Sequence, residues 1–465
     1  MLASYTASSL LSEEQRAFLD EVAVSFTVSD ETLNTIVTRA HAELYRGLAR
    51  SDGGRASELP MSPTFVRQAS NLANRVSLGM AIEASGRRIR IGSVHFDASG
   101  AVKHKHTQVF SPPQSELSTA QARFFDYAAY CVREFLQQHN LEHAGVCLPL
   151  GVTIGLPVHT GKGVQCSVSE TAKEDSLDLC GSNVGRRLCD AMLRGHLPVH
   201  ITSVTNNVVS ALVAARFQDP GACVAATFNH GVNAAYFERL GNVEKLHSAE
   251  HNAASEVAVN TEIGRFGSAG NALPLTMWDR RVDRESRNPR TRALEKLVAD
   301  QYLGEIVRSL ITDFIDRQLL FAPNCPVQAI SSAYSFHSAY MAPIIEDESA
   351  DLVTVDALFA AEFGIRCSPA DRLVIRSLCE IVAARAARLS GAVLAALVLK
   401  ASTDNRVVNV ALGGVLFDIN QKLLDDTTAA MEQLLQTHPK QVQTKVVFQG
   451  RGDDLFGAAV NAAQA

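Results

Sequence analysis

The chain has 465 residues, of which 46% are hydrophobic and 20% are charged, so it is long enough for about two or three globular domains. Its net charge of −6 argues against a basic protein whose main ligand is nucleic acid, and we expect no direct nucleic-acid contact. The nine cysteines include no Cys-x-x-Cys pair, which favours free thiols in a reducing compartment. Residues 1–12 contain neither a basic segment nor a long apolar run, so we expect no signal peptide, no membrane contact and an intracellular location, cytoplasmic or nuclear.

The first third of the chain is expected to begin with helices and to continue with strands. Ser12 can cap a helix and Gln15 completes a capping box, which predicts helical structure over 12–50. Residues 51–64 contain two glycines and two prolines and are predicted to form a linker. The elements expected next are, in order, a strand pair within 75–96 that turns at 85–86, a strand at 101–110, a helix at 118–140 and a buried strand at 143–157.

The rest of the chain alternates strand and helix signals through residue 240 and then becomes mostly helical. Long amphipathic helices are expected at 300–320 and 369–400. Short strands are expected at 407–412 and 445–448, each followed by a helix. This order of elements indicates an α/β protein with a strong helical share in its second half.

Six segments between residues 59 and 308 resemble segments of the eukaryotic hexokinase family, in the family's order. One reads Asn-Thr-Glu-Ile-Gly-Arg-Phe-Gly at 260–267, where the family has Asn-Thr-Glu-Trp-Gly-Ala-Phe-Gly. Another reads Gly-Val-Asn-Ala-Ala-Tyr at 231–236 and is similar to the family's sugar loop, Gly-(Ser/Val)-Asn-Ala-Cys-Tyr. The other four lie at 59–66, 148–157, 283–296 and 302–308. The resemblance extends from about Leu59 to Ala463, and six matches in order can hardly arise by chance.

The resemblance implies an α/β fold of the actin-like ATPase (ribonuclease H-like) type, with two α/β domains flanking a cleft. In sugar kinases this cleft closes around the sugar and the nucleotide and excludes water. The expected parts are an N-terminal helical segment and linker at 1–66 that packs with the large domain, a small domain at 67–202, a large domain at 203–448, and a C-terminal helix at 449–465 that returns to the small domain.

The resemblance places Asn206 where the family has its general base. Residues 203–209 read Ser-Val-Thr-Asn-Asn-Val-Val, whereas the family has Val-Asn-Asp-Thr-Val-Gly, whose Asp takes the proton from the sugar 6-hydroxyl. A carboxamide cannot accept a proton near pH 7, so Asn206 cannot act as a base. Two interpretations stay open: Asn206 bonds a sugar hydroxyl as a neutral group, or it is a strand-end residue satisfied by the backbone.

The nucleotide site that the resemblance implies departs from the family pattern in each of its elements. In the phosphate hairpin Ala81 replaces the metal-site Asp, and Glu83 and Ala84 replace paired glycines. Asp453 and Asp454 replace part of a loop that faces phosphate and adenosine. Since glycine lets backbone amides approach phosphate and an acid repels it, nucleotide affinity is expected to be low. The degenerate nucleotide site is expected to comprise Ala81, Glu83, Ala84, Ser85, Arg88, Asn229, Gly231 and Gly413.

The sugar side is closer to the family pattern. Asn233, Glu262 and Glu295 match residues that hydrogen-bond hexose hydroxyls in the family, and the alternative for each Glu is a surface or helix-face acid. Thr171 and Lys173 match only with a shift of one residue, and Lys173 is either a remnant near the transferred phosphate or a solvated loop residue. The expected sugar site comprises Asn206, Asn233, Glu262, Glu295 and Thr171.

These observations predict a catalytically inactive, hexokinase-like protein with a regulatory or nutrient-sensing role. The pattern of losses is similar to that of the atypical hexokinases of filamentous fungi, which implies carbon-dependent gene regulation, including control of extracellular protease production. A hexose and an unidentified regulatory protein are the expected partners. No cofactor is expected, and no His, Cys or carboxylate cluster has metal-ligand spacing. The alternatives are an active or slow ATP-dependent hexose kinase, which would need Mg-ATP, and a scaffold without a ligand.

Overall fold

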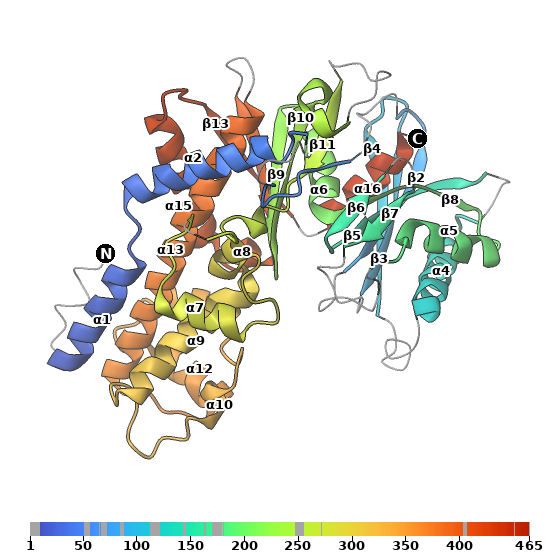
Figure 1. Ribbon diagram of the computed structural model, residues 1–465. Helices are drawn as coiled ribbons and strands as arrows, with labels where there is room; N and C mark the ends of the chain where they lie inside the picture. Colours follow the sequence, from blue (N-terminus) through green and yellow to red (C-terminus); the bar gives the residue numbers. More distant parts are fainter. Residues whose placement is uncertain are drawn as a thin grey trace.

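The structure is a computed structural model in which two mixed β-sheets form the centres of two α/β regions (Figure 1). It describes residues 10–50, 56–64, 66, 72–83, 88–111, 121–142, 146–161, 164–169, 179, 181–246, 255–270, 272–402, 407–450 and 452–464.

The larger region contains a six-stranded sheet in the order β1-β11-β10-β9-β12-β13. Strands β9, β10, β11 and β1 pair antiparallel, whereas β12 pairs parallel with both β9 and β13. The strands are β1 (Ser62–Thr64), β9 (Ala222–Phe228), β10 (Val232–Arg239), β11 (Glu256–Asn260), β12 (Val408–Gly413) and β13 (Thr444–Gln449).

The smaller region contains a five-stranded sheet in the order β4-β3-β2-β5-β8. Strands β2, β3 and β4 pair antiparallel, and β5 pairs parallel with β2 and β8. The strands are β2 (Val76–Ile82), β3 (Ile89–Phe96), β4 (Val102–Phe110), β5 (Leu148–Ile154) and β8 (Val199–Asn206), and a separate pair is formed by β6 (Val158–Thr160) and β7 (Cys166–Val168).

Helices cover both sheets. In chain order they are α1 (Glu13–Phe26), α2 (Asp30–Arg46), α4 (Gln121–Gln138), α5 (Val184–Arg194), α6 (Asn207–Gln218), α7 (Met277–Glu285), α8 (Ala293–Val298), α9 (Asp300–Asp316), α10 (Gln328–Ser331), α11 (Met341–Ile345), α12 (Val353–Phe363), α13 (Pro369–Ala401), α14 (Val415–Asp418), α15 (Gln421–Thr437) and α16 (Asp453–Ala463). Short 3₁₀ turns are η3 (Leu240–Asn242), η4 (Glu244–Leu246), η5 (Ile263–Arg265) and η6 (Ser338–Tyr340).

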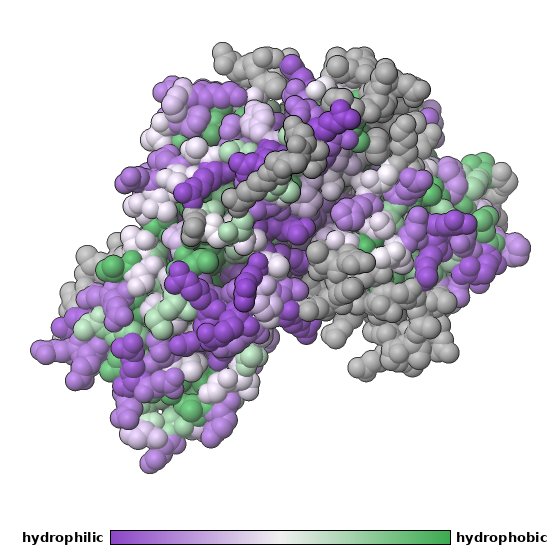
Figure 2. Space-filling model, viewed as in Figure 1, coloured by the Kyte–Doolittle hydropathy of each residue, from purple (hydrophilic) through white to green (hydrophobic). Residues whose placement is uncertain are grey.

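Helix α13 is the centre of the larger region. Its start combines a Ser368–Asp371 capping box with Pro369 at the first helical position, which suits proline because that position needs no backbone N–H. Helices α1, α2, α9 and α15 pack against it. By length and composition α13 could span a membrane, but 83% of its most apolar window is buried inside the molecule. Most residues of α13 are buried, so it is a core helix. On the face shown in Figure 2, hydrophilic and hydrophobic residues are interspersed over the described surface.

The C-terminal helix α16 connects the two regions by packing against the five-stranded sheet and against α6 (Figure 1). Glycines bring its backbone into direct contact with its neighbours. A Cβ on Gly151 of β5 would lie only 2.0 Å from the carbonyl oxygen of Ala458, and Gly79 of β2 makes a similar close approach. On the other side, a Cβ on Gly457 would lie 1.7 Å from the carbonyl oxygen of Ser210. No larger side chain fits at these positions.

The elements expected from the sequence are confirmed, with ends that differ by several residues. The Ser12–Gln15 capping box is present at the start of α1. The linker predicted at 51–64 is wrong in its last residues, because Ser62–Thr64 pairs with β11 as an edge strand. The boundary expected between residues 202 and 203 falls inside β8, which continues to Asn206 as part of the five-stranded sheet. The turn at 85–86 lies outside the described residues.

Replacing Gly457 by Ala is expected to lower the free energy of unfolding by about 2–3 kcal/mol, because the new methyl group would overlap the Ser210 carbonyl. Helix propensity alone predicts the opposite sign, since Ala is favoured over Gly in a helix by about 1 kcal/mol. Urea denaturation measures the difference. Gly450→Ala is the control, because no atom lies within 4 Å of a Cβ there, and it should change stability by less than about 0.5 kcal/mol. Equal stability of the two variants would contradict the close-contact account.

Candidate functional site

Asn206 ends β8 and serves as the N-cap of α6. Its extended backbone lets the side-chain oxygen accept a hydrogen bond from the Val208 amide at 3.0 Å. Its side-chain nitrogen donates to the carbonyl oxygen of Leu156 at 2.9 Å, and the residue is 3% exposed. These contacts match the interpretation of Asn206 as a strand-end residue satisfied by the backbone.

A network of amide and carboxylate groups extends from Asn206 into the six-stranded sheet. The side-chain nitrogen of Asn233, in β10, lies 3.3 Å from the Asn206 side-chain oxygen and 2.8 Å from that of Asn260. The same nitrogen lies 3.2 Å from Oε1 of Glu262, which also accepts a hydrogen bond from Asn260 at 2.9 Å. Residues from both sheets therefore meet in a single polar network.

Asn260 is a member of this network that sequence reasoning did not single out. It is the last residue of β11 and is 1% exposed. The signal was its place at the start of the Asn-Thr-Glu segment, two residues before Glu262. A buried Asn needs partners for both ends of its amide, and here its oxygen accepts from Asn233 while its nitrogen donates to Glu262.

Glu262 is held in a left-handed turn, with φ at 56°, that opens η5. Its backbone amide donates to the side-chain oxygen of Asn233 at 3.0 Å, so Asn233 contacts both the backbone and the carboxylate of the same residue. The left-handed conformation is uncommon for a residue with a long side chain. The two contacts from Asn233 stabilise it and fix the direction of the carboxylate.

Glu295, in α8, places a buried carboxylate beside this network. Its Oε2 accepts a hydrogen bond from the Val232 amide at 3.0 Å, and its Oε1 lies 3.4 Å from a guanidinium nitrogen of Arg292. A Cβ on Gly231 would lie 2.8 Å from the Glu295 carboxylate, which explains the glycine at this position. Burial raises the pKa of Glu295, and the nearby charge of Glu262 acts in the same direction, whereas Arg292 and the Val232 amide lower it.

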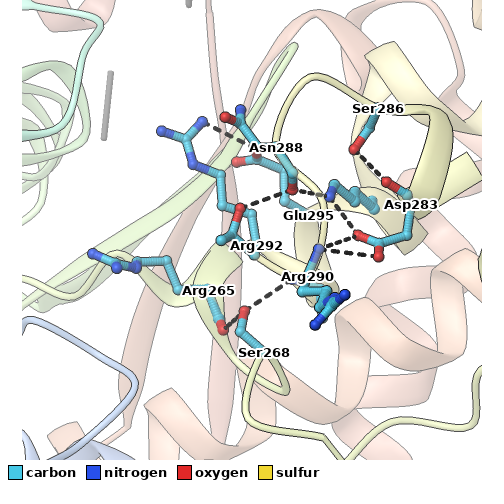
Figure 3. A network of polar contacts seen from close by, with 11 residues as sticks. Arg265, Ser268, Asp283, Ser286, Asn288, Arg290, Arg292 and Glu295 are labelled. Atoms are coloured by element: carbon cyan, nitrogen blue, oxygen red, sulfur yellow. Dashed lines mark hydrogen bonds and ion pairs between the residues drawn. The ribbon is translucent and has the colours of Figure 1, made fainter. Parts of the chain in front are cut away.

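A second set of contacts, shown in Figure 3, fixes the loop between α7 and α8. The buried ammonium of Lys296 binds a carboxylate oxygen of Asp283 and the carbonyl oxygen of Asn288, both at 2.5 Å. Both carboxylate oxygens of Asp283 also accept the backbone amide of Arg290 at 3.1 Å. This loop carries Arg292, so its rigidity determines where the Arg292–Glu295 pair lies.

The hairpin expected to hold phosphate joins β2 to β3. Ala81 is buried in β2 and pairs with Arg90, so it offers no metal ligand. The amide of Glu83 donates to the carbonyl oxygen of Arg88 at 3.2 Å, which closes the base of the hairpin, and the Arg88 side chain is exposed. Ala84 and Ser85 lie outside the described residues, as do Thr171 and Lys173 on the sugar side.

Asn229, which is expected in the degenerate nucleotide site, follows β9 and is hydrogen-bonded to the segment after β12. The side-chain oxygen of Asn229 accepts the backbone amide of Val415 at 2.9 Å, at the start of α14. A Cβ on Gly413 would lie 2.9 Å from the Cβ of Gln449, and Gly414 has φ at 124°. Sheet packing therefore requires Gly413 and backbone conformation requires Gly414, so neither glycine is evidence of a phosphate site.

The two acids at 453 and 454 occupy the first turn of α16. Asp453 accepts the Gly450 amide at 3.0 Å, and Asp454 forms an ion pair with Arg90 of β3 at 2.7 Å. Burial raises the pKa of Asp453, opposed by the Gly450 amide and by Lys105. Acids at a helix N-terminus occupy the position at which the helix could otherwise bind a phosphate. Together with Ala81 and Glu83, these residues do not fit a magnesium–nucleotide complex.

The structure thus brings together Asn206, Asn233 and Glu262. Glu295 lies next to them, where its carboxylate accepts the backbone amide of Val232, the residue before Asn233. Among the described residues no group of three His, Cys, Asp or Glu side chains is arranged to hold a metal ion. The arrangement can donate and accept hydrogen bonds with a polyhydroxylated ligand, since it combines three carboxamides with two carboxylates. At the position of Asn206 it presents a carboxamide whose oxygen and nitrogen are both engaged by the backbone.

Replacing Glu295 by Gln is expected to raise stability at pH 7 and to leave it nearly unchanged near pH 4. Because the folded-state pKa of Glu295 is raised above its ordinary value of 4.5, its ionisation costs stability. The neutral carboxyl contributes stability that is fully present below pH 4.5 and is lost as the pH rises through the folded-state pKa. Because Gln is neutral at every pH, the variant does not lose this stability at pH 7.

Urea denaturation of the parent and of Glu295→Gln at both pH values measures this effect. Glu348→Gln, at an exposed position, is the control and should differ little from the parent at either pH. A Glu295→Gln variant that is less stable than the parent at pH 7 would show that the carboxylate form is favoured in the folded state. An equal shift at both pH values would show that the effect does not depend on ionisation of Glu295, and either result would contradict the raised pKa.

Comparison with known proteins identifies the family. A family model described as hexokinase matches residues 223–464, more than half of the chain, and a second hexokinase model matches 18–217. Hexokinase-1 of Schizosaccharomyces pombe is 27% identical over 433 residues, which cover 92% of this chain and 86% of that protein. Hexokinase-2 of Candida albicans is 26% identical over 450 residues, covering 96% and 91%. A Schistosoma mansoni hexokinase solved in complex with glucose superposes with a TM-score of 0.85 at 24% identity, over 97% of this chain and 99% of that chain. The chain has the hexokinase fold, of the actin-like ATPase type, and belongs to the hexokinase family.

Proposed function

We propose that this hexokinase-family protein does not transfer phosphate and acts as a hexose-responsive regulator. The observation that carries the proposal is the state of Asn206. Its side-chain oxygen caps α6 and its nitrogen binds the Leu156 carbonyl, so the position of the family's base holds a neutral group with a structural task. A general base needs a group that can take a proton near the working pH, and a carboxamide cannot.

The nucleotide side supports the same proposal. Ala81 provides no carboxylate for a metal ion, Glu83 adds a negative charge at the phosphate hairpin, and Asp453 occupies the first turn of α16. Phosphoryl transfer depends almost entirely on positioning and electrostatic stabilisation of the nucleotide phosphates. We therefore propose that Mg-ATP is not a cofactor of this protein.

The sugar side supports a ligand-dependent role. Asn233, Asn260 and Glu262 are already held in place by one another, and a preformed set of polar groups loses little entropy on binding. We propose that a hexose binds there and shifts the balance between two arrangements of the sheets, which an unidentified protein partner recognises. The proposed setting is intracellular, cytoplasmic or nuclear, and the proposed output is carbon-dependent gene regulation.

Family membership favours a second candidate, a slow ATP-dependent hexose kinase. A coupled assay with glucose or fructose and Mg-ATP separates the two, with an active fungal hexokinase assayed in parallel. We expect no turnover above background, whereas kinases typically reach about 1–100 per second. Turnover in that range that is lost in Asn206→Ala would establish the kinase and contradict the proposal.

Asn206→Asp is expected to leave the protein inactive, because a base without positioned phosphates has no electrophile to act on. The change should also lower stability, since a carboxylate would face the Leu156 carbonyl at the place where the amide now donates. The same assay and a urea denaturation curve measure both effects. Robust sugar-dependent ATP hydrolysis by this single variant would show that the nucleotide site is functional.

Glucose is expected to bind weakly, with a dissociation constant on the order of 1–10 mM, and to raise the melting temperature. Glu262→Gln should abolish the shift, because Oε1 of Glu262 is the acceptor shared by Asn233 and Asn260. The exposed variant Glu348→Gln should respond like the parent. If the parent shows no shift up to roughly 50 mM glucose, well above that affinity range, the hexose-responsive model fails and the ligand-free scaffold remains.

A further inference from the structure

The five-stranded sheet ends at β4, which has a neighbouring strand on one side only among the described residues. In the order β4-β3-β2-β5-β8, β4 pairs with β3 alone. A strand directs part of its backbone N–H and C=O groups to each side, so the outer groups of an edge strand can pair with a further strand. With nine residues, β4 is the longest strand of its sheet and offers a long edge.

Four consecutive residues of this edge strand are basic and exposed. They are Lys103, His104, Lys105 and His106. Because side chains alternate along a strand, the two histidines share one face of the sheet and the two lysines share the other. The β4 edge therefore carries basic groups on both of its faces.

The histidine face extends beyond β4. His95 of β3 pairs in register with His104, and the ring of His139, just after α4, lies 4.6 Å from that of His106. Burial lowers the pKa of His95, and His106, His104 and Lys103 act in the same direction. Burial and His106 likewise lower the pKa of His139. The groups that act on these two imidazoles are all basic, and no carboxylate is among them.

The lysine face adjoins the start of α16. The Lys105 ammonium lies 3.6 Å from the ring centre of Phe456, and its charge opposes the burial that raises the pKa of Asp453. Lys103, two residues earlier on the same face, is exposed. Lys105 is thus partly engaged by α16, whereas the Lys103 side chain extends the basic edge into solvent.

Charge decides which kind of strand can add to this edge. Lysines on an edge strand normally keep other strands away. A second copy of this chain that paired through the same strand would place basic residues opposite one another, which is destabilising. A strand that carries carboxylates would form cross-strand pairs of opposite charge with the same residues. The edge therefore disfavours a neutral or basic strand and favours an acidic one.

We propose that β4 docks an acidic segment of another protein, which adds to the five-stranded sheet as an extended strand. Backbone hydrogen bonds along the outer edge provide affinity, and carboxylates that face Lys103, Lys105 and the histidines provide specificity. This inference rests on the proposed function for the existence of a protein partner, and it assigns the chemistry of that partner and the place where it docks.

Fluorescence anisotropy with the full chain at low salt tests the docking site. The probe is a labelled peptide as long as β4 that contains only glutamate and threonine, with one glutamate for each basic residue of the edge. A companion peptide keeps every glutamate and replaces two adjacent threonines by proline, which removes backbone donors. We expect the first peptide to bind with a dissociation constant below about 100 μM and the proline peptide to bind at least about tenfold more weakly.

Lys103→Glu should lower the affinity for the first peptide about tenfold, because it replaces an attraction by a repulsion at an exposed position. Lys445→Glu is the matched control, since Lys445 is an exposed lysine on β13, the edge strand of the other sheet. It should change the affinity by less than about twofold, the effect of a distant charge screened by salt. Thermal unfolding should show that both variants are folded.

Acid should strengthen binding, because histidine gains its positive charge between about pH 8 and 5 while glutamate stays ionised. We expect the affinity at pH 6 to exceed that at pH 8 by about threefold or more, the scale of one or two exposed ion pairs. The double variant His104→Gln and His106→Gln should remove this difference. An unchanged pH dependence in the double variant would show that the imidazoles do not face the peptide and would overturn the inference.

Three other results overturn it. Equal binding of the proline peptide would mean that charge alone suffices, without strand addition. Equal or tighter binding of a single-stranded oligonucleotide of matched charge would identify a general polyanion surface. Equal losses in Lys103→Glu and Lys445→Glu, or no binding of either peptide, would remove the site. The glucose-dependent melting shift should persist in Lys103→Glu, and its absence from the parent would contradict the proposed function while leaving the docking site in place.

Discussion

The direct backbone-to-backbone contact of α16 with its neighbours is the constraint on which the rest of the structure depends. Gly151 and Gly457 let the helix backbone touch β5 on one side and α6 on the other, so the last helix of the chain fixes α6 relative to the five-stranded sheet. Gln449 adds a hydrogen bond of 2.7 Å to the Ala211 carbonyl from the end of β13. Because Asn206 caps α6, the position of the central residue of the site follows from this packing.

The polar network around Asn206 is stable because its central residues are neutral amides. A carboxylate in the same buried place would have to be ionised to act as a base, and burial disfavours the charged form. Asn206, Asn233 and Asn260 offer donors and acceptors in equal number and satisfy one another and the backbone. The Asn206 amide holds its partners in place, and a carboxamide does not take up a proton near pH 7.

Local signals in the sequence predicted the local structure. The features that the sequence analysis missed depend on contacts between residues far apart in the chain. Capping residues and hydrophobic patterning located α1, α13 and the strands β2 to β5, β12 and β13, because these features act within a few residues. The strand at Ser62–Thr64 was missed because its pairing with β11 joins residues about 200 positions apart. The family pattern drew attention to Asn206, Asn233 and Glu262. It could not show that Asn206 is used as a helix cap, since that depends on the exact end of β8.

The same helix that organises the fold also carries the clearest departure from a nucleotide site. A helix N-terminus attracts anions, and in α16 this attraction is met by the chain's own Asp453 and Asp454, one bound to the Gly450 amide and the other to Arg90. A phosphate would have to displace these contacts and approach two carboxylates. The molecule has the two-sheet frame of the hexokinase family, and the anion-attracting end of its last helix is occupied by carboxylates of the chain itself.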